Sequence, residues 1–540
     1  MDNTKRIILA IVLCVIVMYG WNFLFPPPEA PPAPAEEQTG EAAPAPAGDA
    51  QSAPPAESQA GGAVTADLSL GREISVDTPL YHAVINSAGG YLLHFQLKEY
   101  TTGVFSETPF DMVDDDSVPL APMGLYLGGE ATWAAFSWNN GVLTSTADGY
   151  LLTLTGTRGS ETIIRRLTFS NATYLIHEDV EVRGADAQDL AFSMATRTLS
   201  GKEVKKGGEI AEEESRYDMT RVSFLGEEQG LKNDQDKEDL ETEPLTAAGA
   251  IYWGGIQSNY FLMAMVPEQE ARFTGGASDN VFTARMAVSL SDQGTSSHAA
   301  CTYYLGPKQK EALEQGPESL AAARDFGWFD FIAKPLLAGI NFFHTYVKNY
   351  GLAIIIMTII IKLVLWPLSQ KSYRSMNQMK KIQPLIAKIR EKYKDDRQKM
   401  NQELMGLYKT YKVNPAGGCF PMLLQIPVFI GLYQALLNAI ELRHAAFIPH
   451  VPFTDIIWLA DLSAKDPFYV TPIIMGLTMF IQQRLSPSMG DPTQAKIMMI
   501  MPIVFTFIFL SFPAGLVVYW LTNNILSIAQ QKMLMREKKA

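Results

Sequence analysis

The chain has 540 residues, a formal net charge of −13 and 47% hydrophobic residues. That length is too great for one simple domain. Its three cysteines, Cys14, Cys301 and Cys419, exclude a disulfide framework and a cysteine-rich zinc site, and we expect no metal and no cofactor. The acidic total hides a division, because residues 29–325 are acid-rich and residues 371–412 are strongly basic. In a chain with apolar spans, this division indicates membrane topology before it indicates a ligand.

An apolar run at residues 7–25 follows a basic pair and is long enough to cross a bilayer. We interpret residues 1–25 as an uncleaved transmembrane signal anchor. A cleaved signal peptide is the alternative, but the small-residue motif at 33–35 lies far beyond the apolar run and next to prolines. Residues 26–65 are rich in Pro, Ala and Glu, a composition that cannot build a core. They predict a disordered tether.

Residues 66–325 consist of short strand-like runs broken by Gly, Asn and Asp, such as residues 73–77, 162–169 and 178–182. Long helical periodicity is absent, so this region predicts a large β-sandwich. We interpret the charged run at 232–243 as a solvated loop. The region has no nucleophile–base constellation and no glycine-rich phosphate loop, so we expect no enzyme.

The helical part begins with residues 326–346, which are aromatic with interspersed charges. Their place before a membrane span favours an interfacial amphipathic helix over a buried domain helix. We expect a five-span core within residues 347–531, with a hairpin at 371–413 and a basic tail at 532–540. The positive-inside rule places the hairpin and the tail in the cytoplasm, with both chain ends inside and the β region outside. The five spans are predicted at residues 351–366, 419–440, 468–485, 496–512 and 514–531.

Lys362 is a cation inside an apolar span, where it costs about 2.5–3.5 kcal/mol unless it has a partner, a wet cavity or a water edge. At about 1.5 Å per residue, Lys362 and Asn523 lie about 12 Å from the cytoplasmic ends of their spans. Gln425 lies about 9 Å in, and Gln482 and Gln483 less than about 5 Å. This shared depth predicts a hydrophilic pocket open to the cytoplasm and closed outward. The alternatives are a snorkelling lysine and amides that only tie helices together.

The basic hairpin predicts two helices, at residues 372–393 and 397–411, because apolar residues recur there at helical spacing. Pro384 is expected to kink or restart the first helix. The pair is either a solvated one that satisfies the positive-inside rule, or a docking arm for acidic chains, a ribosome or phospholipid headgroups. The cations of the docking hypothesis are Lys380, Lys381, Lys388, Arg390, Lys392 and Lys394.

Three motifs together resemble those of the YidC/Oxa family of membrane insertases. The segment 414–427 (NPAGGCFPMLLQIP) is similar to the family signature, and the Lys362 span is followed by Pro367 as in that family. The segment 512–520 (FPAGLVVYW), followed by Asn523, is similar to the family's last span. The outer β region and the N-terminal anchor resemble the long Gram-negative form.

The resemblance implies a multi-domain integral protein of the bacterial inner membrane. Its fold is an α-helical bundle of five spans plus an anchor helix, with a periplasmic β-supersandwich domain and a cytoplasmic helical hairpin. Thr358 and Trp520 match family positions that face the substrate path, and Tyr519 belongs to the same candidate groove. The family's groove cation is usually arginine, so Lys362 keeps the charge but removes the guanidinium fork.

The function implied is that of an insertase and chaperone. It moves nascent membrane proteins from the cytoplasm into the bilayer through a hydrophilic groove open to cytoplasm and lipid. The expected partners are nascent membrane proteins, the Sec translocon, the ribosome and membrane lipids, without a specific nucleic-acid sequence.

Two rival functions remain at this stage. A secondary transporter would need a repeated pair of broken helices and polar residues across the whole bilayer, and the spans show neither. A membrane-anchored carbohydrate-binding or carbohydrate-active protein would use the β region, but no carboxylate pair can be assigned there.

Overall fold

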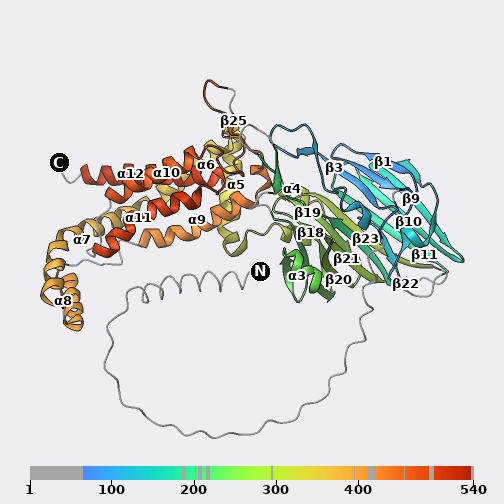
Figure 1. Cartoon of the computed structure of the whole chain (residues 1–540), viewed down its shortest axis with the longest axis horizontal. Coiled ribbons are helices and arrows are strands. Elements are labelled where there is room, and N and C mark those ends of the chain that lie inside the picture. Colours follow the sequence, from blue (N-terminus) through green and yellow to red (C-terminus); the bar gives the residue numbers. More distant parts are fainter. Residues whose placement is uncertain are drawn as a thin grey trace, which may run out of the picture.

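The structure is a computed structural model in which two regions lie side by side (Figure 1). A β-rich region occupies one end, and a bundle of helices extends from it toward the helical hairpin at the other end. The predictions for the N-terminal anchor and for nearly all of the tether lie outside the described residues. The structure describes residues 65–67, 69–184, 189–200, 202–204, 210–214, 219–292, 296–394, 396–411, 420–454, 457–485 and 492–536.

The β-rich region contains two large antiparallel sheets and a smaller one. The 11-stranded sheet has the path β16 (Gly230–Asp234), β15 (Arg221–Gly226), β18 (Ile251–Gln257), β19 (Phe261–Pro267), β23 (Ser296–Pro307), β11 (Leu175–Arg183), β10 (Glu161–Ser170), β9 (Gly149–Arg158) and β7 (Ser137–Trp138), with β22 (Ser291–Asp292) on β23 and β8 (Val142–Ser145) on β9. The 6-stranded sheet has the order β17 (Leu245–Gly249), β20 (Ala271–Ser278), β21 (Val281–Ser289), β12 (Asp189–Thr196), β5 (Leu125–Leu127) and β6 (Glu130–Ala131). The 4-stranded sheet has the order β1 (Glu73–Asp77), β2 (Tyr81–Asn86), β3 (Leu92–Thr101) and β4 (Pro109–Asp111), and β13 (Lys202–Val204) pairs with β14 (Ile210–Glu214).

The predicted strands at 73–77, 162–169 and 178–182 are all present, as β1 and as parts of β10 and β11. Alternation explains how the sheets close on a core, because every second side chain of a strand points to the same face. In the two large sheets, strands β15 and β18 pack against β20 and β21. Phe224 of β15 and Phe273 of β20 meet there with ring centroids 5.5 Å apart. The β-sandwich architecture predicted for this region is therefore confirmed.

A buried ion pair ties the sheets together. Arg165 of β10 and Glu178 of β11 are both fully buried, with Nε and Oε1 2.5 Å apart. Arg165 also donates to the carbonyls of Gly89 and Met123, and Tyr303 donates from its hydroxyl to Glu178 Oε2 at 2.7 Å. Hydrogen bonds to the remaining lone pairs and protons are what a buried ion pair requires.

The charged run at 232–243 is not a simple loop. Its start belongs to β16, and residues further on form α3 (Lys237–Thr242). Asp236 caps α3, because its carboxylate accepts from the backbone N–H groups of Glu238 and Asp239. The solvated-loop interpretation was wrong, because the acidic residues of this run are the N-cap and the first turn of a helix.

The helical region confirms that each apolar run of the core forms a helix. The shorter elements between the last strand and the helices are α4 (Lys310–Leu313), η2 (Glu318–Ala323) and η3 (Gly327–Phe329). The helices are α5 (Asp330–Val347), α6 (Tyr350–Val364), α7 (Trp366–Lys392), α8 (Arg397–Thr410), α9 (Phe420–Asn438), α10 (Val470–Leu485), α11 (Pro492–Phe509) and α12 (Ala514–Arg536). None of the helices within the described ranges is both long and apolar enough to cross a membrane alone, whereas Tyr350–Val364 and Trp366–Ser372, bent by 59°, pass that test as a pair.

The hairpin differs in detail from its prediction. Helix α7 begins at Trp366 directly after α6, and it continues through Pro384 without a break. Proline is compatible with a helix start, so Pro367 fits the first turn of α7. The apolar positions of α7 and α8 do meet as predicted, with Ile382, Ile386 and Leu404 buried between the two helices.

Helix α5 packs one face on the bundle and leaves aromatic side chains on another. Ala333, Leu336, Leu337 and Ile340 are buried, and α5 contacts α6 and α9. The exposed aromatic side chains of α5 and the preceding turn are Trp328, Phe331, Phe342 and Tyr346. The helix is therefore amphipathic, as the sequence predicted.

Candidate functional site

Lys362 lies in the last turn of α6 with only 8% of its surface exposed. Its Nζ donates to Ser527 Oγ at 2.7 Å and to Asn523 Oδ1 at 3.2 Å, and both partners are on α12. Among the described residues these partners are neutral, and no carboxylate forms an ion pair with this ammonium. An ammonium has three donors, so one remains for another acceptor. Lys362 therefore points between helices and not along α6 to the membrane edge.

Gln425 joins the same cluster from a third helix. Its Nε2 donates to Asn523 Oδ1 at 2.9 Å, so this one amide oxygen accepts from both Gln425 and Lys362. Polar side chains from α6, α9 and α12 therefore meet at one place, whereas their common depth in a membrane stays a prediction. We name Lys362, Gln425, Asn523 and Ser527 the polar cluster.

Ser527 is the member that sequence reasoning missed. It is 2% exposed, and its hydroxyl also donates to the backbone carbonyl of Asn523 at 2.7 Å. The available signal was its spacing, because a residue four positions after Asn523 lies on the same face of a helix. The bond to Asn523 also leaves the lone pairs of Ser527 Oγ facing Lys362.

Thr358 and Tyr519 line the bundle near the polar cluster without bonding to Lys362. Thr358 is 2% exposed and donates from Oγ1 to the carbonyl of Ile354, within its own helix, at 2.7 Å. Tyr519 is 1% exposed, and its ring stacks on that of Phe429 with centroids 6.4 Å apart. Both residues are packed in this conformation.

Trp520 faces an aromatic group and not the polar cluster. Its ring meets Phe429 edge-on with centroids 4.7 Å apart, and it contacts Phe509 at 5.2 Å and Phe505 at 6.1 Å. These partners come from α9 and α11. Trp520 is half-buried, so part of its surface remains accessible.

Gln482 and Gln483 lie near the end of α10, and the structure does not join them to the polar cluster. In the described part of the chain, the hydrogen bonds of Lys362 and Gln425 go to α12 and not to α10. Helices α10 and α12 are instead tied by Asn524, whose Nδ2 donates to Thr478 Oγ1 at 3.3 Å. Within the described residues, neither glutamine hydrogen-bonds to Lys362 or Gln425.

The cations of the docking hypothesis lie on α7 or directly after it. Lys381, Lys388, Lys392 and Lys394 are exposed, whereas Arg390 is half-buried. Lys392 Nζ also lies 5.1 Å from the ring centroid of Tyr393. Ile382 and Ile386 of the same helix are buried against α8, so the hairpin presents charge on one side and packs apolar residues on the other. For Lys380, only its place in α7 is described.

A second set of contacts, which we call the docking loop, joins the helices to the β-rich region. It comprises residues 440–443, directly after α9. Ile440 is 4% exposed and packs within the core of the β-rich region. Glu441 pairs with Arg324 at 2.9 Å, and both side chains are about nine-tenths buried. Arg443 donates from Nη2 to the carbonyl of Thr101 at 2.8 Å.

The guanidinium of Arg443 also lies over two stacked rings. Its Cζ is 5.3 Å from the ring centroid of Phe110 and 5.2 Å from that of Phe261, whose own centroids are 4.2 Å apart. Burial, and then the charge of Arg443, lower the pKa of the neighbouring His444 to about 3. His444 is therefore neutral at physiological pH, and Arg443 carries the charge of this contact.

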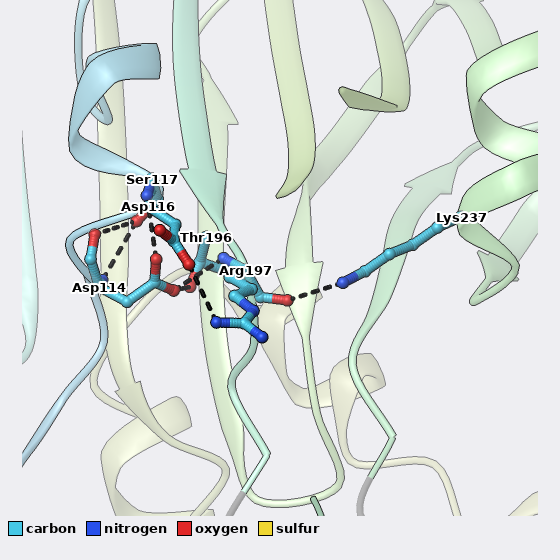
Figure 2. Close-up of polar contacts among 6 residues, drawn as sticks. All are labelled: Asp114, Asp116, Ser117, Thr196, Arg197 and Lys237. Atoms are coloured by element: carbon cyan, nitrogen blue, oxygen red, sulfur yellow. Dashed lines mark hydrogen bonds and ion pairs between the residues drawn. The ribbon is translucent and has the colours of Figure 1, made fainter. Parts of the chain in front are cut away.

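Asp114 and Asp116, which belong to a run of three aspartates in the β-rich region, form local contacts (Figure 2). Asp114 accepts from the backbone N–H of Ser117 at 2.9 Å and from that of Arg197 at 2.9 Å. Asp116 pairs with the Arg197 guanidinium at 2.9 Å, and Lys237 donates to the Arg197 carbonyl at 3.3 Å. These carboxylates fix a loop against the end of β12.

The chain combines a β-rich region with a helical bundle that holds a buried cation. Comparison with known proteins finds a family model for each of these two parts. A family model described as "60Kd inner membrane protein" matches residues 342–540. A second, described as "YidC periplasmic domain", matches residues 73–338.

Relatives match over the whole length. The chain is 48% identical over 554 residues to the membrane protein insertase YidC of Maridesulfovibrio salexigens, with 100% of each chain covered. It is 50% identical over 556 residues to that of Nitratidesulfovibrio vulgaris (Miyazaki F), covering 99% of this chain and 100% of the relative. A solved active YidC insertase with its first transmembrane domain resolved is 18% identical, with a TM-score of 0.36 and coverage of 85% and 91%. The chain therefore belongs to the YidC family of membrane protein insertases, as the motifs predicted.

Proposed function

We propose that this chain moves nascent membrane proteins from the cytoplasm into the lipid bilayer, and that their polar segments pass the polar cluster. The full-length relatives that carry the name membrane protein insertase support this function. The secondary-transporter and carbohydrate-binding alternatives are not favoured.

The observation that carries the proposal is the state of Lys362. A buried cation without a counter-charge is costly, and proteins keep such residues within membranes mainly for function. Its described partners, Ser527 and Asn523, are neutral, so the positive charge remains available. An acidic segment of a substrate would supply the missing charge and take up the third donor of the ammonium.

The driving force of insertion is the substrate's own hydrophobicity. The chain has no nucleotide-binding motif, and transfer of a Leu, Ile, Phe or Val to the centre of a bilayer gains about 0.3–0.6 kcal/mol per residue. The insertase then lowers a kinetic barrier, which is the passage of the polar flank. We infer that Thr358, Gln425, Tyr519 and Trp520 line the path beside Lys362, and that Gln482 and Gln483 hydrate its cytoplasmic mouth.

We further infer five membrane spans in residues 347–531 and an anchor at 1–25, with both chain ends in the cytoplasm. Residues 66–325 then form the periplasmic domain, joined by the tether at 26–65. The exposed cations of α7 support a cytoplasmic docking role toward the ribosome and acidic nascent chains. The Sec translocon is the expected partner for larger substrates.

The test uses purified protein in liposomes without other proteins. A small substrate with one apolar segment and a short acidic tail is added, and protease protection of the tail is measured. Protection that requires the insertase supports the proposal. Uptake of a small solute by the same liposomes, without tail protection, would favour the transporter.

A further inference from the structure

The connection between α9 and α10 carries a small hairpin with a fixed base. Its strands are β24 (Ile448–His450) and β25 (Ile457–Leu459), with Ile448 opposite Leu459. Phe447 donates from its backbone N–H to the carbonyl of Leu459 at 2.9 Å, and its own carbonyl accepts from Asn349 Nδ2 at 3.0 Å. Asn349 is the N-cap of α6, so the base of the hairpin is attached to the start of that helix.

The tip of this hairpin has an unusual residue for its backbone conformation. The N–H of Thr454 donates to the carbonyl of Val451 at 3.0 Å, which closes a four-residue turn with Pro452 and Phe453 in the middle. Phe453 has φ 66°, in the left-handed region. Proline in the second position and positive φ in the third define a type II turn, where glycine or asparagine normally occupies the third position. A bulky residue with positive φ is a genuine outlier.

The same residue is fully exposed. Phe453 has a relative accessibility of 106%, the largest among the exposed large apolar residues of the described chain. A side chain that strains the backbone and contributes no packing does not stabilise the fold, because glycine would serve the turn better. Backbone strain of this kind clusters at functional sites, so the strained and exposed Phe453 is a candidate for a contact outside the folded chain.

The position of the hairpin indicates what that use is. It lies between the end of α9 at Asn438 and the start of α10 at Val470. Under the proposed function both helices are spans, so their connection lies at the outer water–lipid boundary. In Figure 1 the segment labelled β25 projects toward the top of the view where the helices meet the β-rich region, across the direction of the helices. A projection in this direction runs along the membrane surface.

We propose that Phe453 is an interfacial anchor that inserts into the lipid headgroup boundary of the outer leaflet. This inference rests on the proposed function, because it needs the membrane to surround the helices. Lipid fits better than a protein partner, since a stable protein interface buries more than about 1,000 Å² and a single four-residue turn offers far less. One aromatic side chain at a bilayer surface needs no matching groove.

The anchor complements the exposed aromatic side chains of η3 and α5, which we call the α5 segment. Trp328, Phe331 and Tyr346 are each more than 70% exposed. The α5 segment and the hairpin are far apart in the sequence, and two points of contact with the same surface restrict the tilt of the bundle. The hairpin thus fixes the outer end of α10 relative to lipid.

The test places a reporter beside Phe453 without replacing it. Thr454→Cys, in a background with the three native cysteines replaced, is labelled with an environment-sensitive NBD probe. The purified full-length protein is reconstituted in phosphatidylethanolamine–phosphatidylglycerol liposomes with spin-labelled lipids. Val142→Cys, at an exposed position of β8, is the control for a probe in water.

We expect blue-shifted emission and lipid quenching at Thr454→Cys, and neither at Val142→Cys. Phe453→Ser should reduce quenching at Thr454→Cys by about half or more, and Phe453→Trp should retain it. Emission like that of Val142→Cys would overturn the proposal. Shielding in native membranes but not in pure liposomes would overturn it too, in favour of a protein partner. Insertion of a substrate by the same liposomes is measured separately, so failure of the proposed function is distinguishable from failure of the anchor.

Discussion

The ammonium of Lys362 on α6 lies 2.7 Å from the hydroxyl oxygen of Ser527 on α12, although 165 residues separate them in sequence. Asn523, one turn before Ser527, accepts from both Lys362 and Gln425. Three helices are thus joined through a cation and neutral partners. These partners hold the Lys362 ammonium in position but do not neutralise its charge.

The first prediction concerns the charge of Lys362. Lys362→Arg should leave insertion near the wild-type level, because the charge remains. Lys362→Ala should lower insertion of substrates with acidic tails about tenfold, or ~1.4 kcal/mol, and affect neutral tails less. Lys362→Glu should be worse still for acidic tails, because like charges then meet in a poorly screened site. Protease protection of matched acidic and neutral tails measures this, with insertase levels checked by blot. Equal defects for both tails would remove the electrostatic role.

The second prediction supplies the missing counter-charge from within the protein. Asn523→Asp places a carboxylate on an atom position that already lies 3.2 Å from the Lys362 ammonium. The internal pair should neutralise the cation and selectively lower insertion of acidic tails, by about as much as Lys362→Ala. Ser527→Ala is the matched control, since it removes the two hydrogen bonds of the Ser527 hydroxyl and no charge. If Asn523→Asp inserts acidic tails as the wild type does, the charge of Lys362 is not what the substrate senses.

The third prediction concerns the docking loop. Arg443→Ala removes a hydrogen bond to Thr101 and a contact with two aromatic rings, so it should lower the melting temperature of the full-length protein by about 2–4 °C. Deleting residues 66–320 removes Thr101, Phe110 and Phe261 together. In that shortened protein Arg443→Ala should have a smaller effect.

The same deletion should leave insertion of a small substrate largely intact, because the polar cluster lies entirely on α6, α9 and α12. Protease protection and thermal unfolding of the four proteins give both answers. Loss of insertion by a shortened protein that is stable and in the membrane would contradict this expectation. A fall in melting temperature caused by Arg443→Ala that is as large after the deletion as before it would contradict the role of the docking loop.

The fourth prediction compares two neighbouring carboxylates of β11. Glu178→Ala leaves the fully buried cation of Arg165 without its counter-charge and should cost about 3–5 kcal/mol. Asp179→Ala breaks a pair with Arg166 in which both side chains are more than one-third exposed, and should cost at most about 1 kcal/mol. Pulse proteolysis of the full-length protein in a urea series measures the β-rich region in both variants. Similar costs would mean that burial does not decide the effect.

The fifth prediction concerns topology and uses the structure to choose the labelled residue. Ser372 is only 6% exposed, so a cysteine there would react poorly on either side of the membrane. Lys388 is exposed on the hairpin and is therefore a better labelling site than Ser372. In a background without native cysteines, Ser52→Cys and Lys388→Cys should be labelled by an impermeant reagent from opposite sides. Labelling of both from the same side would reject the proposed orientation.

The sequence was sufficient to predict the helices, because long apolar runs leave few other structures possible. It was also sufficient for the meeting of Lys362, Gln425 and Asn523, since an amide and a cation inside apolar helices need partners. It was insufficient for Gln482 and Gln483. Depth along a helix can be counted from its ends, but the direction in which a side chain points depends on how the helix is rotated in the bundle.

Other features depended on contacts that no local pattern contains. Ser527 is a small residue near the end of a helix, and only its hydrogen bond with Lys362 shows that it belongs to the polar cluster. Residues Glu441 and Arg443 follow a predicted span, where charged residues normally indicate a water-exposed loop, and their burial depends on partners more than a hundred residues earlier. The sequence shows the proline that is typical of a type II turn, but it does not show that Phe453 adopts a positive φ.

The docking loop has a consequence for the order of events during synthesis. Thr101 leaves the ribosome 342 residues before Arg443, which is its hydrogen-bond partner, and Ile440 completes a core whose other members are translated far earlier. The β-rich region therefore reaches its final packing only after α9 and the docking loop that follows it have been made. Until then, the aromatic pair Phe110 and Phe261 lacks the cation that covers it. Completion of the β-rich region thus depends on synthesis of the helical region, and a chain halted before α9 would keep that surface open to chaperones and proteases.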